Sequence, residues 1–221
     1  MEISSLPPML NTRPTASGCS TSEIYGKNTS DRLGEEDDRI LGSPLKSRWS
    51  YSEAKAIEEI LAYTYYRQKG LPSVIVRLFN TVGPRQTGHY GMVIPRFVGQ
   101  AVKGEAVTVY GNGTQTRCFC YVGDIVDALV KLSEHPEAVG RVFNLGGVQE
   151  ISMEALAQRV IELAGSESKV RYVSYEEAYE EGFEDMQRRV PDTTRAHELI
   201  GFEPTVDLDG ILETVIADQR G

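Results

Sequence analysis

Apolar positions recur every three or four residues between residues 50 and 69, the spacing typical of one face of an α-helix. The members of this face are Ala54, Ile57, Leu61 and Tyr65. Ser50 and Glu53 have the spacing of a capping box, and Gly70 predicts the end of the helix. The run of branched apolar residues at 72–80 that follows predicts a buried strand.

Helical and strand patterns continue to alternate along the rest of the chain. Ser152 begins a weak capping pattern, and Asn112 with Gly113 predicts the turn of a β-hairpin over 106–122. Further helices are predicted at 92–104, 123–135, 152–165, 190–201 and 207–219, and further strands at 141–147 and 169–175. This alternation favours the α/β class, with a small mixed region toward the C-terminus.

Two segments lack a regular pattern. Residues 1–19 are rich in Pro, Ser and Thr, so we expect an irregular start there. Residues 31–47 are acidic and contain Gly and Pro, which predicts a loop.

Composition narrows the function. The chain has 221 residues, 40% of them hydrophobic, which is enough for a packed core. Its net charge of −9 disfavours nucleic-acid binding, so any phosphate would be met by a few placed arginines. Three cysteines and the lack of a secretory or membrane-length apolar run lead us to expect a cytoplasmic protein without membrane contact. The three histidines have no metal-ligand spacing, and we expect no metal site.

One pair of side chains has the spacing of a general base. Tyr51 and Lys55 lie one helical turn apart, where an ammonium group favours the ionised phenol. Tyr65 and Lys69 have the same spacing, so the pair alone does not identify a site. A simple contact on the helix surface is the alternative.

The context of the first pair resembles a known family. The motifs "STSEIYG", "YSEAK", "VRLFNTVGPRQ" and "GNGTQTRCFCYVGDIVDAL" occur in this order. They are similar to the extended short-chain dehydrogenases/reductases, and within them to NAD-dependent nucleotide-sugar epimerases, dehydratases and decarboxylases. The resemblance implies a partial doubly wound, Rossmann-like parallel sheet with a small C-terminal α/β substrate-binding region. It implies an atypical segment at 1–19, the C-terminal part of the catalytic domain at 20–90, and a nucleotide-sugar-binding region at 91–221, some of whose elements return to the core.

The resemblance also implies catalytic roles. Tyr51 would take the proton from a sugar hydroxyl while NAD accepts the hydride, and Thr21 would hydrogen-bond the same oxygen. Lys55 would support the Tyr51 phenolate and hold the nicotinamide ribose, and Leu78 would contact the cofactor. Without the resemblance, Thr21 would be read as an ordinary turn hydroxyl.

Substrate contacts follow from other matched positions. Asn80, Arg117 and Arg189 would bind the diphosphate of a nucleotide sugar, most simply a UDP-sugar. Val93 and Tyr110 would line the pocket for the base. The helix at 50–69 would pair two copies into a homodimer through a four-helix bundle.

The residues after Thr21 bear on the reaction. In the family's dehydratases the corresponding three residues read "TDE", with an Asp as the acid. This chain has Ser22 in place of that Asp, which puts dehydration in doubt. We expect a UDP-sugar 4-epimerase; the alternative is a UDP-glucuronate decarboxylase, in which Glu23 lies near the sugar carboxylate and Arg189 matches a functional arginine.

The Gly-rich turn G-x-x-G-x-x-G of the family is absent from the sequence. We therefore expect the C-terminal portion of such an enzyme, with NAD binding dependent on another polypeptide or a longer chain. A non-catalytic protein that only binds a nucleotide sugar is the second hypothesis.

Overall fold

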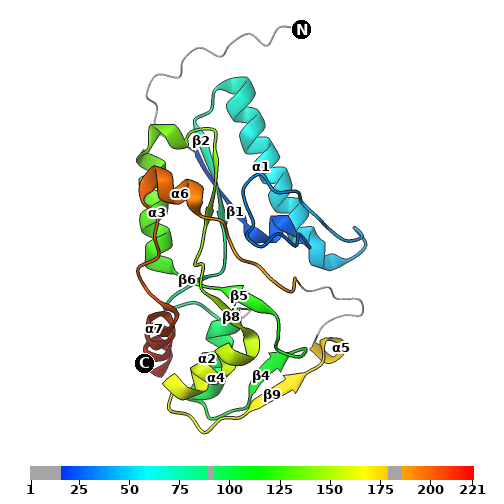
Figure 1. The fold of residues 1–221 in the computed structure, drawn as a ribbon, viewed down its shortest axis with the longest axis vertical. Coiled ribbons are helices and arrows are strands. Elements are labelled where there is room, and N and C mark those ends of the chain that lie inside the picture. Colours follow the sequence, from blue (N-terminus) through cyan, green and yellow to red (C-terminus); the bar gives the residue numbers. More distant parts are fainter. Residues whose placement is uncertain (1–15, 89–91, 179–185) are drawn as a thin grey trace.

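A parallel sheet of three strands forms the centre of the upper lobe (Figure 1). The computed structural model describes residues 16–88, 92–178 and 186–221. Within them, β1 (Ala16–Thr21) pairs with β2 (Ser73–Leu78), and β2 pairs with β7 (Val142–Leu145). All three strands run in the same direction, so their carboxyl ends meet at one edge of the sheet.

Helices cover both faces of this sheet (Figure 1). Helix α1 (Ser50–Lys69) lies on one face, and α3 (Val122–Glu134) and α6 (Thr194–Ile200) lie on the other. Phe143 and Leu132 are fully buried between the strands and the second pair of helices. Burial of a side chain of this size stabilises the fold by about 2 kcal/mol relative to its exposure. The layering confirms the predicted partial doubly wound α/β class.

The lower lobe packs three helices around a second apolar core (Figure 1). These are α2 (Val93–Val102), α4 (Met153–Leu163) and α7 (Leu208–Arg220), against strand β4 (Val107–Tyr110), which pairs in parallel with β9 (Val170–Val173). The shorter elements are η1 (Ser22–Tyr25), η2 (Ser47–Trp49), β3 (Thr81–Val82), β5 (Thr116–Cys118), β6 (Cys120–Tyr121), η3 (Pro136–Ala138), β8 (Glu150–Ser152) and α5 (Tyr175–Ala178).

The predicted hairpin over 106–122 is wrong. The turn exists, since the Asn112 side chain accepts a hydrogen bond from the Thr114 amide at 3.1 Å. However, β4 pairs with β9 and β5 pairs with β8, so the strands on either side of the turn diverge. The turn signal was local, whereas strand pairing depended on partners more than thirty residues away.

The predicted capping box of α1 is also wrong. The 3-10 turn η2 leads directly into α1, and the N-cap residue is Trp49, which makes no side-chain capping bond. The Ser50 hydroxyl donates to the Ser47 carbonyl at 2.8 Å, and Glu53 forms an ion pair with Arg39 instead. By contrast, Ser152 does cap α4, because its hydroxyl accepts from the Ala155 amide at 3.1 Å.

The irregular start extends less far than expected. Residues 16–19 belong to β1, although they carry Ser and Gly in place of a continuous apolar run. Pairing with β2 satisfies the backbone groups on one side of this stretch, which composition alone did not indicate. Residues 1–15 lie outside the described part of the chain.

The apolar face predicted on α1 points to solvent in the single chain. Ile57, Leu61 and Tyr65 are each more than half exposed, and so is Ile60 beside them. The buried side of the helix carries Ser52, Ala56 and Glu59 instead. An exposed apolar face of this size on one helix is typical of a surface that another protein covers.

Within residues 16–88, 92–178 and 186–221, no helix has the length and apolar character needed to cross a bilayer. The same residues contain no group of three or more His, Cys, Asp or Glu side chains placed to hold a metal ion.

Candidate active site

A cavity of about 640 Å³ lies at the carboxyl ends of β1 and β2. This edge is where parallel α/β sheets bind their ligands, because loops diverge there. The first turn of α2 supplies the opposite wall. The lining residues are Thr21, Ser22, Glu23, Arg48, Tyr51, Leu78, Phe79, Asn80, Thr81, Val82, Gln86, Met92, Val93, Ile94, Pro95, Phe119 and Arg189.

Two of these lining residues are Thr21, the last residue of β1, and Glu23, in the turn η1 that follows. The Thr21 hydroxyl accepts a hydrogen bond from the Glu23 amide at 3.2 Å and so caps η1. Gly26 ends the turn with a φ of 59°, and a Cβ there would lie 2.3 Å from the Ile40 carbonyl oxygen. The chain therefore needs glycine at this position to bring the loop back against the turn.

Glu23 lies between two guanidinium groups on the cavity wall. Arg48 Nη1 lies 2.6 Å from Glu23 Oε2, and Arg189 forms an ion pair with the other carboxylate oxygen. Arg189 also donates to Asn80 Oδ1 at 3.1 Å. Burial raises the pKa of Glu23, but the charges of Arg189 and Arg48 outweigh burial and hold this pKa below its usual range. Glu23 is therefore a carboxylate at neutral pH.

Sequence reasoning missed Arg48. The residue lies three positions before Tyr51, just upstream of the motif "YSEAK". Nothing in the local pattern distinguishes it from a surface arginine. Its importance depends on contact with Glu23, which comes from a segment 25 residues earlier in the chain.

Tyr51 lines the cavity, with half of its side chain exposed. Lys55 does not line it; its ammonium donates to Glu58 at 2.7 Å and to the Cys19 carbonyl at 3.1 Å. The hydrogen bond to Glu58 raises the pKa of Lys55, and the nearby Tyr51 adds to this effect. The lysine is thus charged, and its support of the Tyr51 phenol stays a prediction.

The remaining predicted site residues divide into two groups. Leu78, Asn80 and Val93 line the cavity. Tyr110 and Arg117 are not among its lining residues. Arg96 stacks over the Tyr110 ring at 4.1 Å from its centroid, and Arg117 is largely buried and donates to the Thr116 carbonyl at 2.7 Å. Their assigned roles stay predictions.

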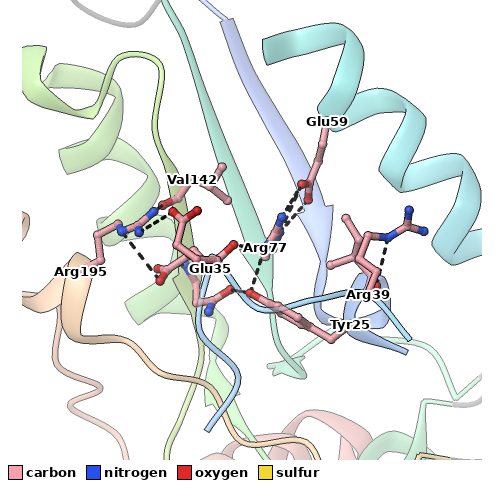
Figure 2. Close-up of polar contacts among 10 residues, drawn as sticks. Tyr25, Glu35, Arg39, Glu59, Arg77, Val142 and Arg195 are labelled. Carbon is pink, nitrogen blue, oxygen red and sulfur yellow. Dashed lines mark hydrogen bonds and ion pairs between the residues drawn. The ribbon is translucent and has the colours of Figure 1, made fainter. Parts of the chain in front are cut away.

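A buried polar junction lies next to η1, whose last residue, Tyr25, takes part in it (Figure 2). Its members are Tyr25, Glu35, Glu59, Arg77, Asn144 and Arg195. Arg77 donates to both oxygens of Glu59 and, at 3.0 Å, to the Tyr25 hydroxyl (Figure 2). Burial raises the pKa of Tyr25 to about 12, so its hydroxyl stays protonated and acts as a donor. No pattern in the sequence indicated this junction.

Comparisons with known proteins agree on the family. The family model for GDP-mannose 4,6 dehydratase matches residues 14–215. Among curated proteins, UDP-N-acetyl-alpha-D-glucosaminuronate decarboxylase of Bacillus cytotoxicus is 43% identical over 198 residues, which cover 89% of this chain and 61% of the relative. UDP-glucuronic acid decarboxylase 1 of Xenopus tropicalis is 38% identical over 199 residues, covering 89% of this chain and 45% of the relative.

Solved structures give the same picture. UDP-glucose 4-epimerase of Thermotoga maritima, solved with UDP-glucose, is 28% identical with a TM-score of 0.80, over 92% of this chain and 62% of that one. UDP-glucuronic acid 4-epimerase of Bacillus cereus, solved with UDP-glucuronic acid and NAD, is 26% identical with a TM-score of 0.80, over 92% and 60%. This chain therefore spans about half to three fifths of the length of the relatives that it matches. Together with the layered sheet and the cavity at its carboxyl edge, these findings show that the chain belongs to the GDP-mannose 4,6 dehydratase family of nucleotide-sugar epimerases, dehydratases and decarboxylases.

Proposed function

We propose that this chain is the substrate-binding and catalytic part of an enzyme that decarboxylates a UDP-linked uronic acid. The observation that carries the proposal is the cluster of Arg48, Glu23 and Arg189. Two guanidinium groups lie beside a single carboxylate on the cavity wall, so among these three side chains positive charge exceeds negative charge by one. A sugar carboxylate would balance this charge and accept hydrogen bonds from the arginine forks, whereas a neutral hexose would not.

The relatives support decarboxylation over the predicted 4-epimerisation. Both curated relatives described above carry a decarboxylase name, and the names of both state a uronic acid substrate. The sequence analysis favoured a 4-epimerase and kept decarboxylation as the alternative. A 4-epimerase of UDP-glucuronic acid also matches in structure, so epimerisation of an acidic sugar is the second candidate.

The proposed roles use the chain's own residues. Tyr51 would accept the proton of the sugar hydroxyl, with Lys55 supporting its ionised form and Thr21 bonding the same oxygen. Arg48 and Arg189 would hold the carboxylate that is lost. Asn80 and Arg117 would bind the diphosphate, and Val93 and Tyr110 would contact the base. Arg117 and Tyr110 do not line the cavity, so the bound substrate would have to extend beyond it to reach them.

The donor set fits NAD at one side of the cavity. Tyr51 and Leu78 line the same space, and Lys55 lies one helical turn after Tyr51 on α1. These residues would hold the nicotinamide end of the cofactor, which supplies a hydride acceptor that turns the sugar alcohol into a ketone. A carboxylate two carbons from a ketone loses carbon dioxide readily, because the electron pair of the broken carbon–carbon bond moves onto the ketone oxygen; the two arginines would position that carboxylate. The pyrophosphate of NAD would be bound by residues of a longer protein or of a second polypeptide.

The test compares two ligands and two products. In calorimetry on the purified chain, UDP-glucuronate is expected to bind at least about tenfold more tightly than UDP-glucose, the equivalent of about 1.4 kcal/mol. For turnover, NAD is added together with the polypeptide that binds its pyrophosphate, and anion-exchange chromatography separates the decarboxylated product, which has one charge fewer, from an epimerised product, which keeps it. Equal affinities would refute the uronic acid assignment, and a product of unchanged charge would replace decarboxylation by epimerisation.

The exposed face of α1 supports a homodimer. Ile57, Ile60, Leu61 and Tyr65 offer a row of apolar side chains along the helix. In a homodimer, α1 of one copy would pack against α1 of the other and bury this face in both. Such a two-fold arrangement is the commonest symmetry of soluble oligomers.

A further inference from the structure

The ion pair on the cavity wall joins two segments that are distant in sequence. Glu23 and Arg189 are separated by 166 residues, and their charged groups are in contact. The two charged groups stay in contact only if their backbones are fixed relative to each other. Backbone and side-chain hydrogen bonds between residues 25–36 and 188–195 fix them, and part of these bonds lies in the buried junction.

The Asn144 side chain bonds to both the segment that carries Glu23 and the segment that carries Arg189. The Tyr25 hydroxyl, two residues after Glu23 in the same turn, donates to Asn144 Oδ1 at 2.7 Å. The Asn144 amide nitrogen donates to the Asp192 carbonyl at 3.2 Å, three residues after Arg189. The same nitrogen donates to the Leu33 carbonyl at 2.8 Å.

Leu33 closes the arrangement around Arg189. The Leu33 amide donates to the Val190 carbonyl at 2.8 Å, and the Asp192 amide donates back to the Leu33 carbonyl at 2.9 Å. Together with Asn144, this short bridge fixes the backbone directly after Arg189.

Asn144 itself has little freedom to move. Its side chain is fully buried, and both amide protons are donated. Its backbone amide donates to the Glu35 carboxylate at 2.9 Å, and its residue pairs with Arg77 in the sheet. An amide is suited to this place because it accepts from one segment and donates to the other without a charge. A carboxylate could not donate, and a hydroxyl is too short to bridge.

We propose that Asn144 is a positioning residue that holds the Glu23–Arg189 pair in register by bonding to both segments that carry it. Charged groups that meet a substrate lose their effect when they move by about 1 Å, so supporting bonds of this kind decide how well a site works. The inference rests on the proposed function in one respect, that the pair meets a sugar carboxylate.

The first readout does not depend on the substrate. Carbon-13 NMR titration of labelled glutamate carboxyls, with Glu23 assigned from Glu23→Gln, measures the pKa of Glu23 directly. In Tyr25→Phe and Asn144→Ser the contact with Arg189 loosens, so the pKa of Glu23 is expected to rise by about half a unit or more. Ser73→Ala is the matched control: it removes a partly buried hydrogen bond, from the Ser73 hydroxyl to the Ala62 carbonyl at 3.3 Å, away from the cavity.

The second readout is ligand selectivity. Both variants are expected to lose about tenfold in affinity for UDP-glucuronate, the equivalent of one charge-assisted hydrogen bond, with little change for UDP-glucose. Thermal unfolding and near-ultraviolet circular dichroism establish that each variant is folded. If Asn144→Ser does not fold, Tyr25→Phe alone tests the positioning role, because this variant keeps the aromatic ring and removes only the hydroxyl.

Two results overturn the positioning role. The first is a Glu23 pKa in folded Tyr25→Phe that matches the wild type, and the second is an equal shift in Ser73→Ala. If the wild type binds UDP-glucose as tightly as UDP-glucuronate, the proposed function fails, while the Glu23 titration still tests the positioning of the pair by itself.

Discussion

Replacement of Arg48 by methionine tests the charge cluster most directly. Methionine keeps much of the length of the side chain and removes the guanidinium that lies 2.6 Å from Glu23. Glu23 is not left unpaired, because Arg189 still contacts its other oxygen. We therefore expect a folded protein with a site that has lost its excess positive charge.

The size of the effect follows from the burial of the pair. A hydrogen bond to a charged group contributes about 1.5–3 kcal/mol, and the lower half applies here because the Arg48 side chain keeps 19% of its exposure. About 1.5–2 kcal/mol corresponds to a loss of roughly 10- to 30-fold in affinity. The affinity for UDP-glucose, which has no carboxylate to pair with Arg48, should change by less than about twofold.

Calorimetry with UDP-glucuronate and UDP-glucose measures both changes in affinity. Arg48→Lys keeps the charge without the fork and should recover part of the loss. Arg188→Met is the control, since Arg188 is adjacent to Arg189 but points to Glu150, with 43% of its side chain exposed. The reasoning is refuted if Arg48→Met weakens both ligands equally, or if Arg188→Met has the same effect as Arg48→Met.

Three further changes test the buried junction and the exposed helix face. Glu59→Gln removes the charge that Arg77 contacts and leaves a buried guanidinium, so urea unfolding should show a loss of about 3 kcal/mol. The pKa of Tyr25 is about 12 in the folded chain against 10.0 as its ordinary value, so the folded state keeps this proton when the unfolded state has lost it. The stabilisation is complete below pH 10 and falls by about 1.4 kcal/mol per pH unit as the pH rises toward 12, a slope that Tyr25→Phe should remove. Ile60→Glu places a charge in the apolar face of α1 and should convert a dimer to monomers in sedimentation experiments.

Each of these three predictions would be contradicted by a specific experimental result. A loss below about 1 kcal/mol for Glu59→Gln would show that water reaches Arg77 and relieves its charge. An alkaline slope that persists in Tyr25→Phe would assign the titration to another group. A wild-type chain that sediments as a monomer, or an Ile60→Glu chain that still dimerises, would remove the pairing through α1; Lys69→Glu, at the exposed end of the same helix, is the charge-change control.

The sequence by itself determined the elements and much of the cavity lining. The 3.6-residue period, branched apolar runs and glycine ends predicted α1, β2 and α3 to within a few residues, because these signals act within one segment. Of the residues that the resemblance singled out, Thr21, Glu23, Tyr51, Leu78, Asn80, Val93 and Arg189 line the cavity. Thr21, Glu23, Leu78 and Asn80 end or follow β1 and β2, whose carboxyl ends meet, a consequence of parallel order that can be read from the chain.

Only the tertiary structure decided which segments meet. Arg48 gained its place from Glu23, Asn144 from Tyr25 and Asp192, and β4 from β9, each pair brought together by packing from distant parts of the chain. A local turn signal at Asn112 could not exclude the divergence of its flanking strands. The physical reason is that periodicity and capping are set by neighbours within a few residues, whereas ion pairs, strand partners and buried amides depend on which surfaces the whole fold brings into contact.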